Sequence, residues 1–465
     1  MSETSTVVVT TDPTTGRELA RYDAMNDASI DHVLDEVAVA ARAWGRTPLT
    51  ERRAALDSVA DRLLAERESV AALITAEMGK PLREARAEVD KSVTTARWYA
   101  RHADSLLTPT PVDVGPDATA WVTHEPIGPV LAVMPWNFPL WQVMRFALPA
   151  ILAGNGILLK HSPDVTGSAL GFEALLERAG LPRHVFRILV VSERDVARVT
   201  DAVVADDRVA GVTLTGSNRA GASVGAAAGR AAKPSVLELG GSDAFVVLAD
   251  ADAERAAEVA VRARFTNAGQ SCVCAKRFVV AAEVAEHFTE AFVARVRALR
   301  VGDPTDDHTD LGPLARPDLR DVLQRQVDAS VAAGAELLVG GHPIDGPGNF
   351  YAPTVLAATS PGMAVFDEET FGPVAAVAVA RDDAHAAELA AATTFGLGLS
   401  VWSGSRERAL DLAREVTTGA VFVNAMVASD PRLPFGGTRR SGHGRELAAP
   451  GLHAFMNQRT FWAVP

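Results

Sequence analysis

The chain contains only two cysteines, Cys272 and Cys274, which lie two positions apart in the stretch FTNAGQSCVCAKR, 265–277. A thiol attacks only as its thiolate, so a reactive cysteine needs surroundings that control its pKa. A lone reactive cysteine in an intracellular enzyme is a candidate nucleophile. The alternative is that both are small buried hydrophobic side chains. Polar residues elsewhere in the chain decide between these interpretations.

Two of these residues suit general-base and oxyanion chemistry. Glu238, in LELGG, ends an apolar segment, where loss of hydration raises the pKa of a carboxylate toward the range of a general base. Asn137 stands among aromatic residues and prolines in MPWNFPLW, and its amide can donate to a developing oxyanion. A buried salt-bridge partner and a turn-forming asparagine are the respective alternatives.

Other segments suit the binding of a phosphate or ribose. Lys160 ends an apolar segment, and a lysine at the carboxyl end of a strand can reach either group. LTGSNRAGASVG, 214–225, indicates a strand, a Gly-Ser turn and a helix start, whose backbone amides favour phosphate. The glycine-rich PFGGTRRSGHGRE, 434–446, indicates close approach of the backbone to other chain or to ligand.

Strands and helices must alternate to position these residues. The expected strands are 130–135, 157–160, 186–191, 212–215 and 236–239, and the expected helices between them are 140–153, 165–179, 193–205 and 218–230. Alternation with short loops predicts an α/β fold with a parallel sheet covered on both faces. Ligands of such sheets bind beyond the carboxyl ends of the strands.

The remainder of the chain divides around this unit. The pattern of apolar residues predicts one long helix from Thr50 to the stop at Gly79, followed by a second from Leu82 to about Leu106. A second α/β domain follows Gly240. The segments 109–126 and 450–465 are extended and partly apolar, so we expect them to pair with a neighbouring subunit.

Composition excludes several classes of function. The net charge of −13 argues against nucleic acid or an anionic membrane as the main partner. Two cysteines this close form no disulfide framework, so we expect a cytoplasmic protein. The first twelve residues lack the features of a signal peptide, and no apolar run reaches transmembrane length. The scattered histidines indicate no metal site.

Taken together, PWNFP, LTGS, ELGG, GQSC, EETFGPV and PFGGTRRSGHGRE resemble the aldehyde dehydrogenase superfamily in order and spacing, over nearly the whole chain. WNFPLWQVMR, LKHSP and GQSCVCAKR look closest to its succinate-semialdehyde dehydrogenase group. The resemblance implies a Rossmann-like cofactor domain over 1–108 and 127–239, and a catalytic domain over 240–449. The segments 109–126 and 450–465 would form a small β oligomerisation ribbon.

The resemblance implies oxidation of an aldehyde through a covalent thiol intermediate. Cys272 would attack the aldehyde carbon, while the Asn137 amide and the Cys272 backbone N–H would hold the oxyanion. Hydride transfer to a nicotinamide would leave a thioester. Glu238 would then activate the water that releases the acid.

The implied cofactor is NADP or NAD. The residues that match the cofactor site are Pro135, Trp136, Lys160, His161, Ser162, Pro163, Gly216, Ser217, Leu239, Gly240, Glu369 and Phe371. NAD-preferring relatives often have a glutamate at the position of Pro163. Without a carboxylate there to repel a 2′-phosphate, the sequence slightly favours NADP, with His161 or Ser162 as nearby donors.

The implied substrate is a small aldehyde, with succinate semialdehyde first. Arg145 matches an arginine that binds the far carboxylate in this group, and a guanidinium suits a carboxylate. The other expected substrate-binding residues are Trp141, Thr266 and Ser271. The group's second arginine, its serine and its lysine are replaced by Thr266, Ala448 and Phe146. Another aliphatic or carboxylated semialdehyde is therefore the alternative.

Three further expectations follow from the resemblance. Cys274 is a candidate redox switch, because in some relatives such a pair closes a reversible disulfide, and a strained ring is easily reduced; a packing role is the alternative. A homodimer or homotetramer is expected. The competing classes are a cofactor-free thiol hydrolase and a non-catalytic structural or binding relative, and the intact Cys272, Glu238 and Asn137 argue against the latter.

Overall fold

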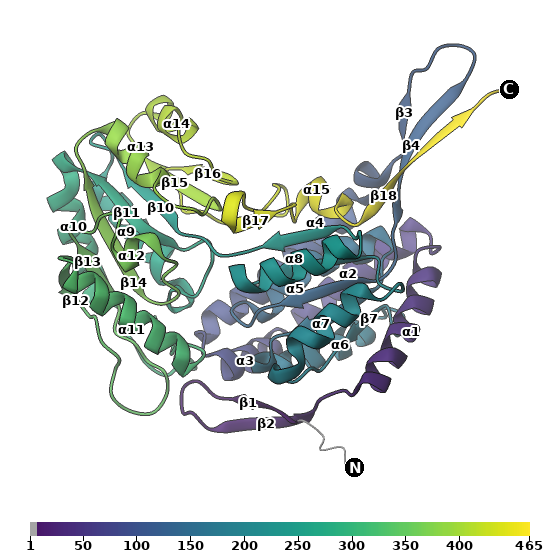
Figure 1. Ribbon diagram of the computed structural model, residues 1–465, viewed down its shortest axis with the longest axis horizontal. Helices are drawn as coiled ribbons and strands as arrows, with labels where there is room; N and C mark the ends of the chain where they lie inside the picture. Colours follow the sequence, from purple (N-terminus) through teal and green to yellow (C-terminus); the bar gives the residue numbers. More distant parts are fainter. Residues whose placement is uncertain (1–6) are drawn as a thin grey trace.

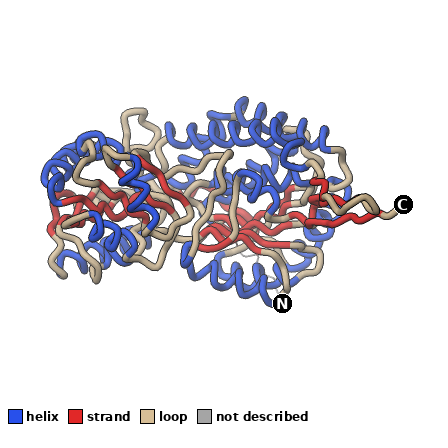
Figure 2. The backbone as a smooth tube through the Cα atoms, turned by 90° about the horizontal axis from the view of Figure 1, so that it is seen from above, coloured by secondary structure: helices blue, strands red, loops and turns tan. Residues whose placement is uncertain are grey.

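The computed structural model describes residues 7–465. Two β-sheets, each covered by helices, form the body of the molecule, and a three-stranded sheet projects from it (Figures 1 and 2). A hairpin of β1 (Val7–Thr11) and β2 (Glu18–Asp23) opens the described chain. The predicted α/β class is confirmed. Within 7–465, no helix is long and apolar enough to cross a membrane.

The first sheet has the strand order β17-β9-β8-β5-β6-β7. Its strands are β5 (Val130–Met134), β6 (Ile157–His161), β7 (Phe186–Ile188), β8 (Gly211–Thr215), β9 (Ser235–Glu238) and β17 (Gly442–His443). All neighbours are parallel except β17 and β9. Because helices cover both faces, the central parts of these strands are mostly apolar, and polar residues such as Lys160 and Glu238 stand at the strand ends.

Each face of this sheet packs against its own helices. One face carries α1 (Asp27–Trp44), α7 (Val196–Ala205) and α8 (Asn218–Arg230). The other packs against α5 (Pro139–Ala153) and α6 (Thr166–Arg178). These two helices are covered in turn by α2 (Leu49–Ala65), α3 (Arg67–Met78) and α4 (Leu82–Leu107). Burial of both sheet faces fixes the strand ends on which the polar residues stand.

The second sheet has seven strands in the order β12-β13-β14-β11-β10-β15-β16, and only β12 is antiparallel to its neighbour. Its strands are β10 (Asp243–Val247), β11 (Ala275–Ala281), β12 (Glu336–Val339), β13 (Thr354–Ala357), β14 (Val374–Ala380), β15 (Gly398–Trp402) and β16 (Ala420–Val423). The helices around it are α9 (Ala253–Phe265), α10 (Ala282–Arg297), α11 (Pro317–Ala332), α12 (Ala364–Asp367), α13 (Asp383–Ala391) and α14 (Arg406–Arg414).

The division into domains remains a proposal. The chain passes from β9 in one sheet to β10 in the other over residues 239–242, which supports a boundary there. β17, however, belongs to the segment assigned to the second domain and pairs with the first sheet. The two predicted domains are therefore joined by strand pairing as well as by the linking chain.

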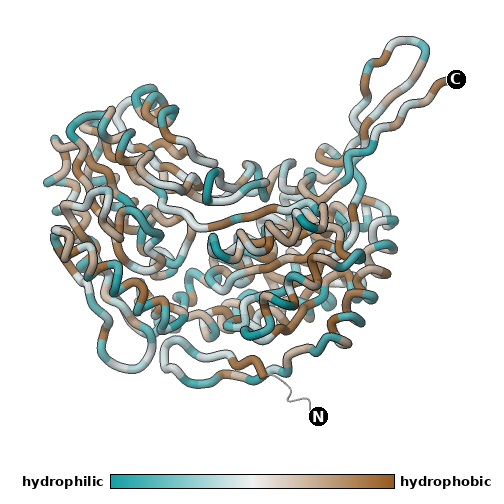
Figure 3. The backbone as a smooth tube through the Cα atoms, in the orientation of Figure 1, coloured by the Kyte–Doolittle hydropathy of each residue, from teal (hydrophilic) through white to brown (hydrophobic). Residues whose placement is uncertain are grey.

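The projecting sheet consists of β3 (Thr110–Val112), β4 (Thr119–Pro126) and β18 (Met456–Ala463), in the order β18-β4-β3. β3 follows α4, β18 follows α15 (Ala448–His453), and the sheet leaves the body as a long ribbon (Figure 1). The Trp121 and Phe461 rings stack on it at a centroid distance of 5.0 Å. Hydrophobic segments lie at its C-terminal end (Figure 3), where Trp462 is 61% exposed.

Two predicted boundaries are wrong. The expected single helix from Thr50 is broken at Glu66, which leaves helical geometry (φ −101°, ψ 15°) between α2 and α3 while its carboxylate binds Arg178 at 2.6 Å. The strand expected over 186–191 ends at Ile188. Beyond Ile188, the Val190 carbonyl accepts from the Met25 N–H, so the chain at Val190 pairs with the segment before α1.

Candidate active site

The residues predicted to carry chemistry gather where the two sheets meet. Asn137 follows β5, Ser217 follows β8 and Glu238 ends β9, so the first sheet presents them at the carboxyl ends of its strands. Cys272 comes from the second sheet, in the loop before β11. Open α/β sheets bind ligands at this edge.

The loop that carries Cys272 is fixed by its backbone and by a buried charge. Asn267 and Ala268 have φ of 54° and 51°, in the left-handed region, and reverse the chain before the cysteine. Lys276 Nζ, from β11, donates to the carbonyls of Ser271 (3.1 Å) and Cys272 (2.9 Å). The Lys276 side chain is fully buried, so this anchor is protected from water.

The Cys272 thiol is not activated by its resting surroundings. Burial raises its pKa to about 12, although the positive charges of Arg145 and Lys276 oppose the shift. The thiol is therefore protonated at neutral pH. A base, or a change in its surroundings on ligand binding, must generate the thiolate.

The Asn137 side-chain amide lies beside the cysteine loop and uses only one of its two N–H groups there. Its Nδ2 donates to the Gln270 carbonyl at 3.0 Å, and Asn267 Nδ2 donates to the Asn137 carbonyl at 2.8 Å. An amide nitrogen carries two hydrogens, and a single acceptor contacts this one within the described chain. The second N–H is available to an oxyanion.

Glu238 is a buried carboxylate without hydrogen-bond partners. It is 2% exposed, and neither of its oxygens finds a donor among residues 7–465. Burial raises its pKa well above the ordinary value, and the negative charge of Glu446 raises it further, while Arg145 and Arg445 oppose both effects. A carboxylate of this kind is poised to take a proton from water.

The glycine-rich segment passes close to Glu238, in agreement with the predicted backbone approach. A Cβ on Gly436, whose φ is 151°, would lie 2.5 Å from Glu238 Oε1 and 3.0 Å from the Arg445 side chain. Only glycine fits this position without displacing the carboxylate.

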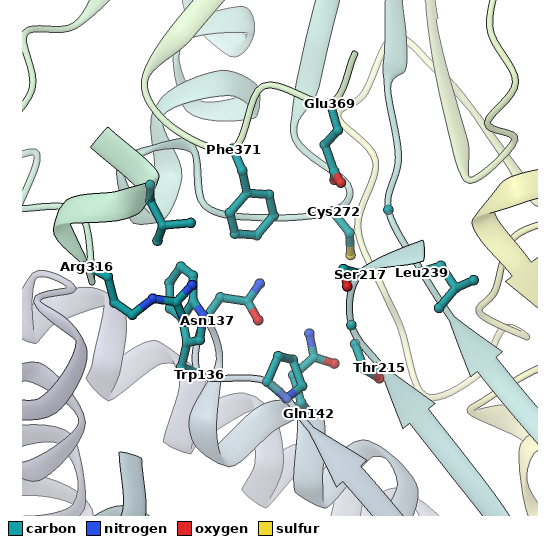
Figure 4. A pocket seen from close by; sticks show the side chains of 14 residues that line it. Trp136, Asn137, Gln142, Thr215, Ser217, Leu239, Cys272, Arg316, Glu369 and Phe371 are labelled. Atoms are coloured by element: carbon teal, nitrogen blue, oxygen red, sulfur yellow. The ribbon is translucent and has the colours of Figure 1, made fainter. Parts of the chain in front are cut away.

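A cavity of about 270 Å³ opens in front of Cys272. It is lined by Pro135, Trp136, Asn137, Gln142, Thr215, Gly216, Ser217, Leu239, Gly240, Cys272, Arg316, Leu319, Glu369 and Phe371. In Figure 4 the Cys272 sulfur, the Asn137 amide and the Phe371 ring surround one space, with Glu369 above it. Eight of the twelve predicted cofactor residues therefore face this cavity.

The wall of this cavity has groups that suit a phosphate and a ribose. Ser217 caps the 13-residue helix α8, accepting from the Ala220 N–H at 3.3 Å, so the amide end of that helix lies at the wall and favours phosphate. A Cβ on Gly240 would collide with the Glu369 carboxylate. Glu369 accepts from the Gly241 N–H at 3.0 Å through one oxygen, which leaves the other for a ribose hydroxyl.

The other four predicted cofactor residues do not line this cavity; they are Lys160, His161, Ser162 and Pro163. His161 is buried, accepts from the Ser162 N–H at 2.9 Å through Nδ1, and lies 3.0 Å from the Pro139 carbonyl through Nε2. Burial lowers its pKa to about 4, so it is neutral and offers no cation to a 2′-phosphate. Burial also lowers the pKa of Lys160, to about 8, which leaves it largely charged at neutral pH.

Arg316 is a cavity residue that sequence reasoning missed. It precedes α11 and lies 5.7 Å from the centre of the Trp136 ring. Its guanidinium contacts Asp164 at 3.1 Å and Asp318 at 2.9 Å. Asp164 also accepts from Ser162 Oγ at 2.7 Å. A carboxylate therefore does stand next to the predicted ribose site, one residue after Pro163, with Arg316 to neutralise it.

A second cavity, of about 180 Å³, meets the first at Cys272. It is lined by Lys91, Phe138, Trp141, Gln142, Arg145, Arg262, Ala263, Thr266, Ser271, Cys272, Val273, Cys274, Met426, Val427, Ala428, Ser429 and Phe435. All four predicted substrate residues face it. Cys272 thus stands where the two cavities join.

Arg145 is held in the wall of the second cavity. It forms an ion pair with Glu446, its guanidinium carbon lies 4.5 Å from the centre of the Phe435 ring, and Nη2 donates to Thr215 Oγ1 at 3.4 Å. The Arg145 and Glu446 side chains are 2% and 4% exposed. The charge of Arg145 is therefore largely matched by a protein carboxylate.

The sequence did not point to Lys91, Arg262 or Ser429 in this cavity. Lys91 and Arg262 belong to charged helices, α4 and α9, where a basic side chain is usually solvated. No local motif distinguishes them. Only the packing of α4 against α5 brings Lys91 to the cavity.

Comparison with known proteins relates this architecture to characterised enzymes. The model of the aldehyde dehydrogenase family matches residues 1–461. The succinate semialdehyde dehydrogenase [NAD(P)+] Sad of Escherichia coli is 46% identical over 458 residues, covering 98% of each chain. The succinate-semialdehyde dehydrogenase [NADP(+)] of Mycobacterium avium is 46% identical over 464 residues, covering 98% of this chain and 96% of that one.

Solved structures agree with these relatives. The succinic semialdehyde dehydrogenase of Streptococcus pyogenes, in complex with NADP+, superimposes with a TM-score of 0.94 at 36% identity, covering 98% of this chain and 100% of that one. The Gox0499 structure superimposes with a TM-score of 0.95 at 37% identity, covering 98% and 99%.

Proposed function

The chain belongs to the aldehyde dehydrogenase family, and from that premise we propose that it oxidises succinate semialdehyde to succinate with NADP+ or NAD+. The observation that carries this proposal is the position of Cys272 at the junction of two cavities, one suited to a dinucleotide and one lined by basic side chains. Relatives named for this reaction, 46% identical over 98% of the chain, support the choice of substrate.

The reaction divides into two halves that use the same sulfur. After a base has taken the thiol proton, the Cys272 thiolate attacks the aldehyde carbon, and the free N–H of Asn137 together with the Cys272 backbone N–H stabilises the oxyanion of the thiohemiacetal. Bound NAD(P)+ accepts the hydride that leaves this carbon. Glu238 then takes a proton from water, which attacks the thioester and releases the acid.

For the cofactor, we propose that Ser217 and the start of α8 bind phosphate and that Glu369 binds a ribose hydroxyl. Trp136, Phe371 and Leu239 form apolar walls of the same cavity. Lys160 supplies a positive charge for the bound cofactor. The NADP-specific names of several relatives and the NADP+ in the streptococcal structure support use of NADP.

For the substrate, we propose that Trp141, Ser271 and Thr266 border the aldehyde and that Arg145 contributes a hydrogen bond from an N–H not used by Glu446 or Thr215. A second candidate is another aliphatic or carboxylated aldehyde. The uncharged Thr266 in the cavity wall favours this alternative, since the related group has an arginine there.

The proposal extends to the second cysteine, to assembly and to location. Cys274, which is 4% exposed and lies beside the Arg264 guanidinium, is the partner of Cys272 in a reversible disulfide. The ribbon of β3, β4 and β18 pairs with a second subunit in a homodimer or homotetramer, which light scattering would refute by finding a monomer. The two cysteines support a cytoplasmic location.

An aldehyde panel with both cofactors tests the function. Succinate semialdehyde, butanal and propanal are supplied with NADP+ or NAD+, and the absorbance of the reduced nicotinamide is followed. The proposal predicts the highest kcat/KM for succinate semialdehyde. A thiol hydrolase or a non-catalytic relative would produce no absorbance change with any pair, and a preference for butanal would point to the second candidate.

A further inference from the structure

Lys91 is a cation in the second cavity that forms no ion pair with a carboxylate of residues 7–465. It lies on α4, and its Nζ is 4.4 Å from the centre of the Trp141 ring and 2.6 Å from Ser429 Oγ, to which it donates. Lys91, Trp141 and Ser429 line the same cavity as Cys272. The side chain is half-buried, so its aliphatic stem packs while its ammonium remains at the cavity surface.

The charges around this cavity leave Lys91 without a counter-ion. Arg145 is paired with Glu446. Asp430, whose negative charge acts on Lys91, is held by Arg432 at 2.7 Å. Within residues 7–465, no carboxylate lies close enough to Lys91 to form an ion pair. The cavity therefore has, at the end formed by α4, a positive charge that is not held in an ion pair.

The pair Lys91–Ser429 has the donors that a carboxylate requires. The ammonium carries three hydrogens, one of which is directed at Ser429. Because the Ser429 hydroxyl accepts from Lys91, its own hydrogen is free to point at an anion. A carboxylate with two oxygens can accept from both, and charge-assisted bonds of this kind are the strong ones.

We propose that Lys91 and Ser429 bind the carboxylate of the substrate, and that they select an aldehyde with an anionic group at its far end. This inference rests on the proposed function and deepens it. Arg145 is too closely matched by Glu446 to supply the selecting charge. Trp141 packs against the hydrocarbon chain between the carboxylate and the aldehyde. Its ring also forms a cation–π contact with the Lys91 ammonium.

Substituting Lys91 tests the proposal by comparing two substrates of equal chain length. Lys91→Met keeps the aliphatic packing and removes the charge. It lowers kcat/KM for succinate semialdehyde by roughly 10- to 100-fold, mostly through KM, and leaves kcat/KM for butanal within about twofold. Lys91→Arg restores part of the loss. Arg101→Met, which removes a cation from the exposed side of the same helix, changes neither value.

A binding measurement with succinate provides a second readout and a check on folding. Succinate inhibits oxidation of butanal in the unsubstituted protein, and its inhibition constant rises by roughly 10-fold or more in Lys91→Met and by less in Ser429→Ala. Unchanged melting temperature and unchanged NADP+ binding show that each variant is folded.

The outcomes separate the two proposals. If the unsubstituted protein prefers succinate semialdehyde and Lys91→Met retains that preference and the succinate inhibition, the inference is overturned and the proposed function stands. If the unsubstituted protein shows no preference for the carboxylated aldehyde and is not inhibited by succinate, both fail.

Discussion

Arg145 and Glu446 form an ion pair in which both side chains are almost completely buried; Arg145 lines the second cavity, and both charges act on Glu238. The pair joins α5 to the glycine-rich segment before α15. Its guanidinium also lies near Cys272, where it opposes the effect of burial on the thiol pKa. The same arginine therefore stabilises the fold and adjusts the chemistry.

Removal of Arg145 should destabilise the protein strongly. Arg145→Ala leaves the Glu446 carboxylate buried without a partner, and we expect the free energy of unfolding to fall by about 3–5 kcal/mol. The double variant Arg145→Met/Glu446→Gln should recover most of this loss, because no charge is then left unpaired. Urea unfolding of the three proteins provides the measurement. Equal stability of the single and double variants would show that the pairing is not the cause.

The pH dependence should differ between a carboxylated and an uncharged aldehyde. Burial raises the pKa values of Cys272 and Glu238, and in the proposed mechanism both groups act deprotonated, so kcat/KM for butanal should rise with pH above neutrality. Burial lowers the pKa of Lys91 to about 8. A cation is lost as pH rises through its pKa, so the KM of succinate semialdehyde should increase above pH 8 while that of butanal should not.

The charged groups around Lys91 define the control for that experiment. The positive charge of Arg145, on α5, lowers the pKa of Lys91. The negative charges of Asp430, in the loop after β16, and of Glu88, on α4 like Lys91, raise that pKa. Lys91→Arg keeps its charge throughout this range. In that variant the increase in KM should disappear, and its persistence would assign the effect to another group.

Arg316 should influence the choice between NADP+ and NAD+. Arg316→Ala leaves Asp164 without its neutralising partner next to the predicted ribose site, and the released carboxylate repels a 2′-phosphate. We expect the Kd of NADP+ to rise roughly twofold to fivefold more than that of NAD+. Quenching of tryptophan fluorescence on titration gives both constants. Adding Asp164→Asn should remove the difference, and an equal rise for both cofactors would refute the electrostatic explanation.

Cys274 should make the enzyme sensitive to oxidation. Peroxide should inactivate the unsubstituted protein, and dithiothreitol should reverse this, because a disulfide between residues two positions apart is strained and easily reduced. In Cys274→Ala the inactivation should no longer be reversible. If peroxide inactivates both proteins in the same way, Cys274 is only a packing residue.

The sequence predicted the parts of the site that stand at the ends of strands. Asn137, Glu238 and Ser217 follow or end apolar segments, and the periodicity of a parallel sheet brings such positions to one edge. Cys272 was identified because the chain has only two cysteines and one of them stands in a recognisable motif.

Side chains that reach the site through tertiary packing could not be predicted. Lys91 and Arg316 look like ordinary solvated charges in the sequence, and they reach the cavities only because α4 packs against α5 and because the start of α11 approaches Trp136. The pairing of Arg145 with Glu446 joins residues far apart in the chain. His161 was expected to face the cofactor, but both of its ring nitrogens are engaged by the surrounding backbone.

The central claim is that the Cys272 sulfur becomes acylated and that Glu238 directs water to the resulting thioester. The most direct test mixes Glu238→Gln with succinate semialdehyde and NADP+, follows the first turnover by absorbance, and maps adducts by mass spectrometry. We predict a burst of about one NADPH per active site, slow turnover thereafter, and a succinyl group on Cys272. Full activity in Cys272→Ala, or an adduct on any other residue, would contradict the account.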